Sequence, residues 1–82
     1  MNPHILVAHV VDDRGVTCNY EVRCYDNIED AMARLSQLIE RARNDMRMSK
    51  YGAGRCFQYN ILASILECDG TSVGYFNIMV SI

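Results

Sequence analysis

The sequence has no tryptophan, a single proline and five glycines. So little proline and glycine leaves no room for a long flexible linker, and the chain is predicted to be one domain over residues 1–82. No run approaches the ~20 apolar residues of a membrane-spanning helix. The segment Met1-Asn2-Pro3-His4 lacks the basic start of a secretory signal, so we expect a cytoplasmic protein.

An excess of positive charge is also missing. Eight Lys and Arg stand against ten Asp and Glu, which gives a net charge of −2 and a pI near 5.5. Attraction of the whole molecule to nucleic acid is therefore not expected. Half of the residues are hydrophobic, which is typical of a globular domain and too many for a disordered chain.

Recognisable catalytic and metal-binding motifs are missing as well. The four cysteines include no Cys-x-x-Cys pair, and neither His4 nor His9 lies at zinc-ligand spacing from a cysteine, so no cofactor or metal is predicted. His9 is expected to be a partly buried core histidine rather than an acid–base group. Cys18 and Cys24 fall in phase with the apolar residues around them and are expected to be buried.

Two strand patterns occupy the first part of the chain. Residues 4–11 are apolar at both odd and even positions, so both faces are apolar, which is typical of a central strand. In residues 16–24, apolar and polar residues alternate, which indicates an edge strand. The apolar residues of the second strand are expected on the same face as Ile5, Val7, His9 and Val11. Residues 12–15 join the two strands as a turn, which explains Asp12 and Asp13 better than a metal site does.

The strongest local signal is a hairpin over residues 57–82 around Asp69-Gly70, with a two-residue type I′ turn. This register places Leu62 opposite Asn77, Leu66 opposite Val73, and Cys68 opposite Thr71. One face of the hairpin is almost wholly apolar and is predicted to join the core: Phe57, Tyr59, Ile61, Ala63, Ile65, Gly74, Phe76, Ile78, Val80 and Ile82.

Between the hairpins, apolar residues recur at helical spacing from Ile28 to Met46. Asp26 and Glu29 are expected to form a capping box, and the helix to end at about residues 44–48. Arg34 is expected to face solvent and to meet Asp30 one turn earlier.

The predicted fold is therefore α+β, with the order ββαββ and a four-stranded antiparallel sheet that carries one helix on one face. With the strands numbered along the chain, the favoured sheet order is 2-1-3-4, and 2-1-4-3 is the competing arrangement. No internal repeat is apparent beyond the presence of two hairpins.

One helix can cover only one face of the sheet, so the other face is predicted to bind a protein. We expect a small non-enzymatic binding module, an inhibitor or an adaptor, that forms a homodimer through this face or docks it on a larger target. Its size is typical of small accessory proteins, including those of viruses. The predicted contact residues are Leu6, Val10, Leu62, Leu66, Val73, Tyr75 and Met79, with Ala8 beside them and Gln58, Asn60, Asn77 and Ser81 as a polar rim.

The alternative is a small nucleic-acid or phosphate-binding domain. Residues 34–55 contain six of the eight basic residues and only two acidic ones. An acidic start and a basic end also match the helix dipole, which explains the charges without a ligand. Steep weakening of binding by salt would distinguish nucleic acid from an apolar protein contact. The predicted anion-binding residues are Arg41, Arg47, Lys50, Tyr51 and Arg55.

The first testable prediction concerns the thiols. Without an export signal, all four cysteines are expected to be reduced in the folded protein. Alkylation under non-reducing, denaturing conditions, followed by intact-mass measurement, should therefore add four labels. Two labels or none would contradict both the free thiols and the cytoplasmic location.

Overall fold

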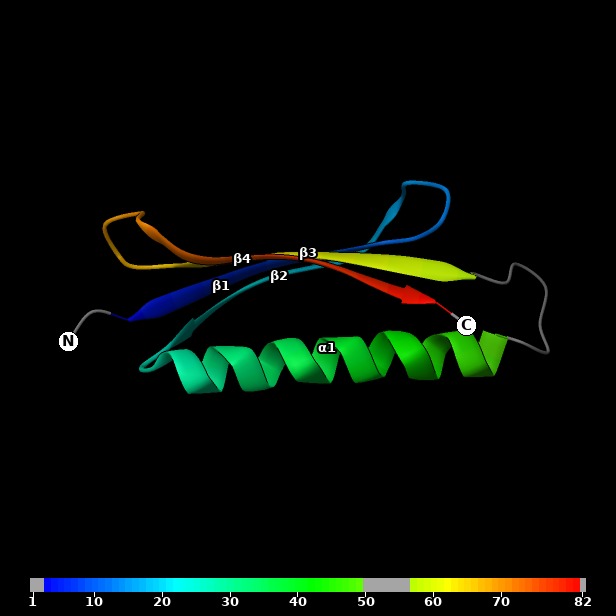
Figure 1. Ribbon diagram of the computed structural model, residues 1–82, viewed down its shortest axis with the longest axis horizontal. Coiled ribbons are helices and arrows are strands. Elements are labelled where there is room, and N and C mark those ends of the chain that lie inside the picture. The colour runs from blue at the N-terminus through cyan, green and yellow to red at the C-terminus, as the bar shows by residue number, and fades with distance from the viewer. Residues whose placement is uncertain (1–2, 50–56, 82) are drawn as a thin grey trace.

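Four strands and one helix follow one another in the predicted order ββαββ. The computed structural model describes residues 3–49 and 57–81, which form one sheet layer and one helix layer (Figure 1). The elements are β1 (His4–Val11), β2 (Thr17–Tyr25), α1 (Ile28–Ser49), β3 (Gln58–Leu66) and β4 (Ser72–Ser81). Among the described residues, no helix has both the length and the apolar character needed to cross a bilayer.

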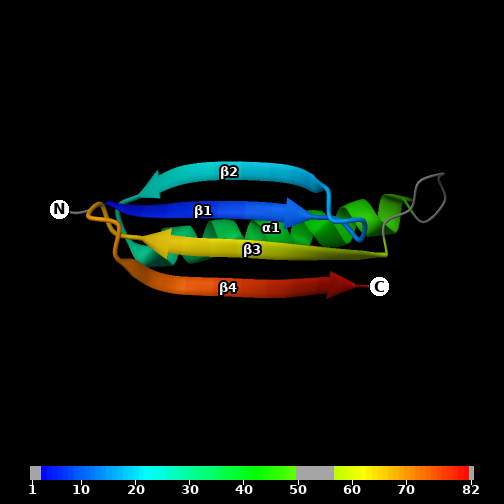
Figure 2. The same ribbon diagram turned by 90° about the horizontal axis from the view of Figure 1, so that it is seen from above.

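The sheet order is β2-β1-β3-β4, with every neighbouring pair antiparallel (Figure 2). This confirms the favoured arrangement and rules out the order 2-1-4-3. The apolar strand β1 is central and the alternating strand β2 is at an edge, as their patterns predicted. The helix runs beneath the sheet, and none of the described helices and strands covers the opposite side (Figure 1).

The core lies between α1 and the two central strands. Burial of these side chains removes apolar surface from water and is the main favourable term in folding. The predicted core face of the C-terminal hairpin is confirmed for its described residues, except that Phe57 is 56% exposed; Ile82 lies outside them. The buried residues are Leu6, Ala8, Val10, Ala31, Leu35, Leu38, Ala42, Met46, Ile61, Ala63, Ile65 and Val80.

The prediction that Leu6, Ala8 and Val10 face away from the helix is wrong. All three are buried in the core against α1. Strand β1 shares its other face with the apolar residues of β2, as expected, because Ile5 pairs with Cys24. That shared face, however, is the uncovered one. The parity of β1 was ambiguous because both of its faces are apolar.

Both hairpins turn in the same way, and the expected type I′ turn is wrong. The N–H of Gly70 donates to the Glu67 carbonyl (2.9 Å), and the N–H of Glu67 donates to the Thr71 carbonyl (2.8 Å). Gly70 has φ of 89°, whereas no non-glycine residue among those described has positive φ. This is a type I turn followed by a glycine bulge. Leu66 therefore pairs with Ser72 rather than with Val73.

The helix is capped by Asn27 rather than by the predicted Asp26. The side-chain oxygen of Asn27 accepts a hydrogen bond from the N–H of Asp30 (2.9 Å), which is the expected contact of a helix N-cap. The helix continues to Ser49, one residue beyond the predicted range.

The two hairpins are related by a half turn about the centre of the sheet (Figure 2). Adding 55 to a residue number carries Gly15 to Gly70, the two glycines with positive φ among the described residues. It also carries Ala8 to Ala63, which pair with each other at the axis. The same shift superposes the turn hydrogen bonds and both register shifts. It also matches Tyr20 with Tyr75.

Substitution of Leu35 tests the placement of the helix. Leu35 is 2% exposed in the core, so Leu35→Ala should lower the free energy of unfolding by about 2–5 kcal/mol. That is a large part of the roughly 4–12 kcal/mol expected for a domain of this length. Urea denaturation measures the change, and Ser36→Ala on the exposed side of α1 is the control. An unchanged midpoint for Leu35→Ala would remove this helix-face assignment.

Candidate functional site

The sheet face turned away from α1, called the outer face below, is the candidate site. Side chains alternate between faces along each strand, and paired residues of neighbouring strands share a face. The register therefore assigns these residues to it: Ile5, Val7, His9, Val11, Thr17, Tyr20, Val22, Cys24, Gln58, Asn60, Leu62, Ser64, Leu66, Ser72, Val73, Tyr75, Asn77, Met79 and Ser81.

Rows of paired residues cross the outer face from one edge to the other. One row runs through Val22, Val7, Ser64 and Tyr75, and the next through Tyr20, His9, Leu62 and Asn77. The residues of the central strands are partly buried by their neighbours, whereas those at the edges stand open to solvent. The exposed fractions are 55% for Tyr20, 52% for Val22, 66% for Tyr75 and 64% for Met79.

None of the outer-face residues is Asp, Glu, Lys or Arg. The solvated face of an antiparallel sheet normally alternates with polar and charged side chains. Here the charged residues of β2, Glu21 and Arg23, lie on the opposite parity, toward the helix side. The outer face therefore combines apolar and aromatic groups with a few uncharged polar ones, as the centre of a protein interface does.

The outer face is also large for so small a protein. Strands of about nine residues span ~30 Å, and four strands span ~19 Å, so the flat area is about 570 Å². That area includes the polar side chains of the face, and it lies within the range of about 300–600 Å² for the largest apolar patch on a typical monomer, a patch that is often functional. Both hairpin tips curve toward the outer side, at opposite ends of the sheet (Figure 1). The face thus lies between two raised ends.

Five of the seven predicted contact residues lie on the outer face: Leu62, Leu66, Val73, Tyr75 and Met79. The other two, Leu6 and Val10, are buried beneath it. Sequence reasoning missed the contribution of the N-terminal hairpin, above all Tyr20, Val22 and Val7. The signal that could have found them was the clean alternation of β2. Its apolar residues were predicted to share a face with Ile5, Val7, His9 and Val11, but that shared face was assigned to the helix side.

Cys24 is exposed on the outer face rather than buried, and its thiol is free. Cys18 is also exposed, and its Sγ donates to the Val16 carbonyl at 3.5 Å. The prediction of two small buried cysteines is therefore wrong. For Cys24 the physical reason is the same as for β1, because the apolar side of β2 faces solvent. Cys18 lies at the register shift and lines the cavity that also contains Arg41.

The two histidines lie on opposite faces of the sheet and form no acid–base pair. His9 is partly buried as predicted, but it belongs to the outer face, where its ring contacts Tyr20 edge to face with centroids 4.5 Å apart. His4 is on the helix side, and its Nδ1 is buried without a hydrogen-bond partner in the described part of the chain. Within residues 3–49 and 57–81, no three potential metal ligands come together.

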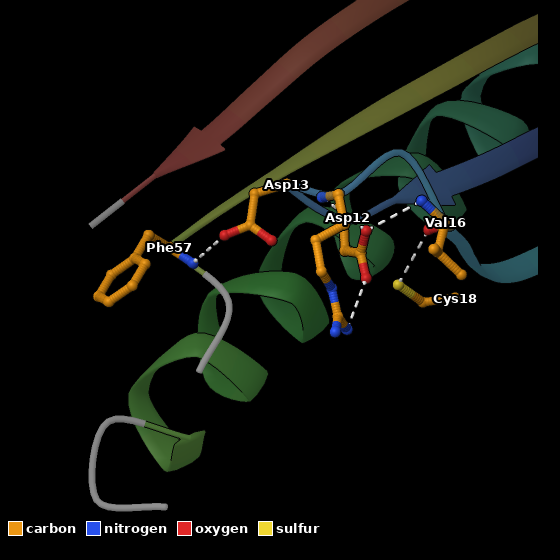
Figure 3. A network of polar contacts seen from close by, with 6 residues as sticks. Asp12, Asp13, Val16, Cys18 and Phe57 are labelled. Carbon is orange, nitrogen blue, oxygen red and sulfur yellow. Dashed lines mark hydrogen bonds and ion pairs between the residues drawn. The ribbon is translucent and has the colours of Figure 1, made fainter. Parts of the chain in front are cut away.

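Asp12 and Asp13 act in the first turn, as predicted (Figure 3). One carboxylate oxygen of Asp12 accepts hydrogen bonds from the N–H groups of Arg14 and Val16, both at 2.9 Å. The backbone N–H of Val16 is the main cause that lowers the pKa of Asp12. Asp13 accepts a hydrogen bond from the N–H of Phe57 at 3.2 Å. These carboxylates hold backbone in place, which accounts for both residues without a metal.

The predicted anion-binding residues are only partly described. Arg41 lines a small cavity of about 150 Å³ together with Asp45, so the two charges there are opposite. Arg47 donates to the Asn44 side chain at 2.7 Å. Lys50, Tyr51 and Arg55 lie outside the described residues. Arg43, in the same segment, forms an exposed ion pair with Glu40 at 2.8 Å.

Arg34 is tied to β2 instead of meeting Asp30. Its Nε and Nη2 donate to the two carboxylate oxygens of Glu21 at 2.9 and 2.8 Å. The Glu21 and Arg34 side chains are only 12% and 18% exposed. Arg23 approaches the same carboxylate at 2.9 Å. The hydrogen bond from Arg34 is the main cause that lowers the pKa of Glu21.

Comparison with protein families, characterised proteins and solved structures gives no match.

The ion pair predicts a pH dependence of stability. Because the pKa of Glu21 is lower when folded, its contribution is complete above the unfolded value of about 4.3 and is lost as pH falls through the folded pKa. Glu21→Gln should lower the urea midpoint at pH 7, and its gap from wild type should shrink toward pH 3. Glu40→Gln, in an exposed pair with Arg43, is the control and should have little effect. An equal gap at both pH values would contradict the prediction.

Proposed function

We propose that the protein is a small non-enzymatic interaction module of the cytoplasm, an inhibitor or adaptor, that docks its outer face on another protein. The observation that carries this proposal is the continuous uncharged face across all four strands, about 570 Å² in area. In water, the apolar side chains of this face remain exposed and do not gain the free energy that burial would provide. A protein partner would recover it.

The composition of the face supports specific docking. Tyr20 and Tyr75 stand open on opposite halves, and tyrosine is among the residues that most often dominate binding energy. Between them, Val7 and Leu62 supply an apolar centre. Asn77 and other uncharged polar groups can hydrogen-bond without the cost of burying a charge.

A second copy packed sheet to sheet is the simplest occupant. Two such faces meet without like-charge repulsion, and stacked sheets pack about 10 Å apart with strands inclined by about 30°. Together they would bury about 1,100 Å², near the lower limit of specific interfaces. A larger target of similar apolar character is the other occupant that the test must distinguish.

Two charges placed on the outer face test the proposal. Leu62→Glu with Tyr75→Glu should leave the fold intact and abolish association, because buried unpaired carboxylates are costly. Sedimentation measures self-association, and circular dichroism with urea denaturation checks the fold. Ala33→Glu with Ser36→Glu adds the same charge on the exposed side of α1 and should leave association unchanged. If the outer-face variant unfolds, that face is part of the core.

Photocrosslinking tests the same face for other proteins. A photoreactive phenylalanine derivative in place of Tyr20 should give discrete adducts in cells that make the protein, and one in place of Gln37 on α1 should not. The mass of the adduct tells a second copy from a different target. In a lysate, salt is added before irradiation and the yield of adduct is measured. A yield that does not fall at high salt agrees with an apolar contact and argues against nucleic-acid binding. No adduct at Tyr20 would refute the proposed function.

A further inference from the structure

The two edge strands occupy equivalent places in the sheet but differ in charge. The half-turn relation matches β2 with β4, so Glu21 corresponds to Phe76 and Arg23 to Ile78. Strand β4 contains no charged residue over its ten positions. Its equivalent strand therefore carries two charges where β4 carries two large apolar groups.

This difference matters because an edge strand presents unpaired backbone N–H and C=O groups. Soluble proteins commonly protect such edges with charges, proline or bulges. Strand β2 has Glu21 and Arg23, and Arg34 approaches it from the helix. Strand β4 has neither charge nor proline, and its described register shift lies only at its start, beside Leu66. The β4 edge is thus open to pairing along most of its length.

We propose that β4 pairs antiparallel with β4 of a second copy and joins two sheets into one of eight strands. The occupant is a second copy because the strand complements itself. In a register centred on Asn77, Phe76 lies opposite Ile78 of the other copy, and Tyr75 lies opposite Met79. Aromatic and aliphatic cross-strand pairs of this kind stabilise sheets.

The faces agree in this register. Phe76 and Ile78 both point to the helix side, where they are only partly buried at the margin of the core. Tyr75 and Met79 both point to the outer side, with exposures of 66% and 64%. Pairing therefore covers apolar groups on both sides of the sheet and satisfies the edge backbone. No charged side chain of β4 opposes it.

This pairing goes beyond the proposed function and rests on a different observation. It would join the two outer faces side by side into one continuous surface of about 1,100 Å². A partner would then meet a two-fold symmetric face twice as large as that of one chain.

Matched lysines at equivalent edge positions test the proposal. Asn77 and Val22 correspond under the half turn, and both are exposed on the outer face. Asn77→Lys places two like charges directly opposite each other at the β4 edge and should raise the dimer Kd about fivefold. In a dimer held through β4 alone, Val22→Lys at the opposite edge of the sheet should change the dimer Kd less than twofold, whereas a face-to-face dimer would be weakened by it as well. Sedimentation equilibrium measures Kd, and urea midpoints confirm that both variants fold.

The outcomes separate this proposal from docking through the outer face. Equal weakening by both lysines indicates a face-to-face dimer, which overturns edge pairing and supports the proposed function. A monomeric wild-type protein also overturns edge pairing, whereas the Tyr20 crosslink then decides the proposed function separately. Hydrogen exchange gives a second measurement: the amides of residues 72–81 should gain protection with rising protein concentration, and those of residues 17–25 should not. Equal gains in both strands would overturn the proposal.

Discussion

Burial of one side of a four-stranded sheet by a single amphipathic helix is the constraint on which the structure depends. Leu38 on α1 and the strand residues Leu6, Ile61 and Ile65 are almost fully buried. In a domain this small, those side chains account for much of the apolar surface removed from water. The chain has one long described helix. No other described element covers the other side of the sheet, which is left for solvent or for a partner.

The ion pair between Glu21 and Arg34 holds α1 against β2, where the helix finds little apolar surface to pack on. Strand β2 turns its polar side toward α1, so it offers the helix little hydrophobic surface. A bidentate guanidinium–carboxylate contact fixes both position and orientation there. As a consequence, the apolar side of β2 adds Tyr20 and Val22 to the outer face.

The half-turn relation between the hairpins gives the outer face two similar halves, but the helix side is not symmetric. The same turn with a positive-φ glycine closes both hairpins. Equivalent positions of the two edge strands carry different residues: β2 carries charged residues, and β4 carries apolar ones. An uncharged, largely apolar face beside one unprotected edge is a surface suited to assembly, and both proposals follow from it.

Much of the fold could be predicted because local patterns were decisive. The helical spacing from Ile28 to Met46, the alternation of β2 and the apolar face of the C-terminal hairpin specified the elements and their order. The hairpin register failed only near its tip, because a glycine bulge and a type I′ turn share the same Asp-Gly signal.

The sequence by itself determined the ββαββ elements, one core side of β3 and β4, and the existence of an uncovered apolar face. Only the tertiary structure decided which side of β1 lies beneath the helix, because Leu6 and Val7 are equally apolar and local pattern cannot choose between them. It also decided that Arg34 reaches Glu21, a contact between residues on different elements. Parity and long-range contacts depend on where the helix sits, and that position is a property of the whole packed sheet.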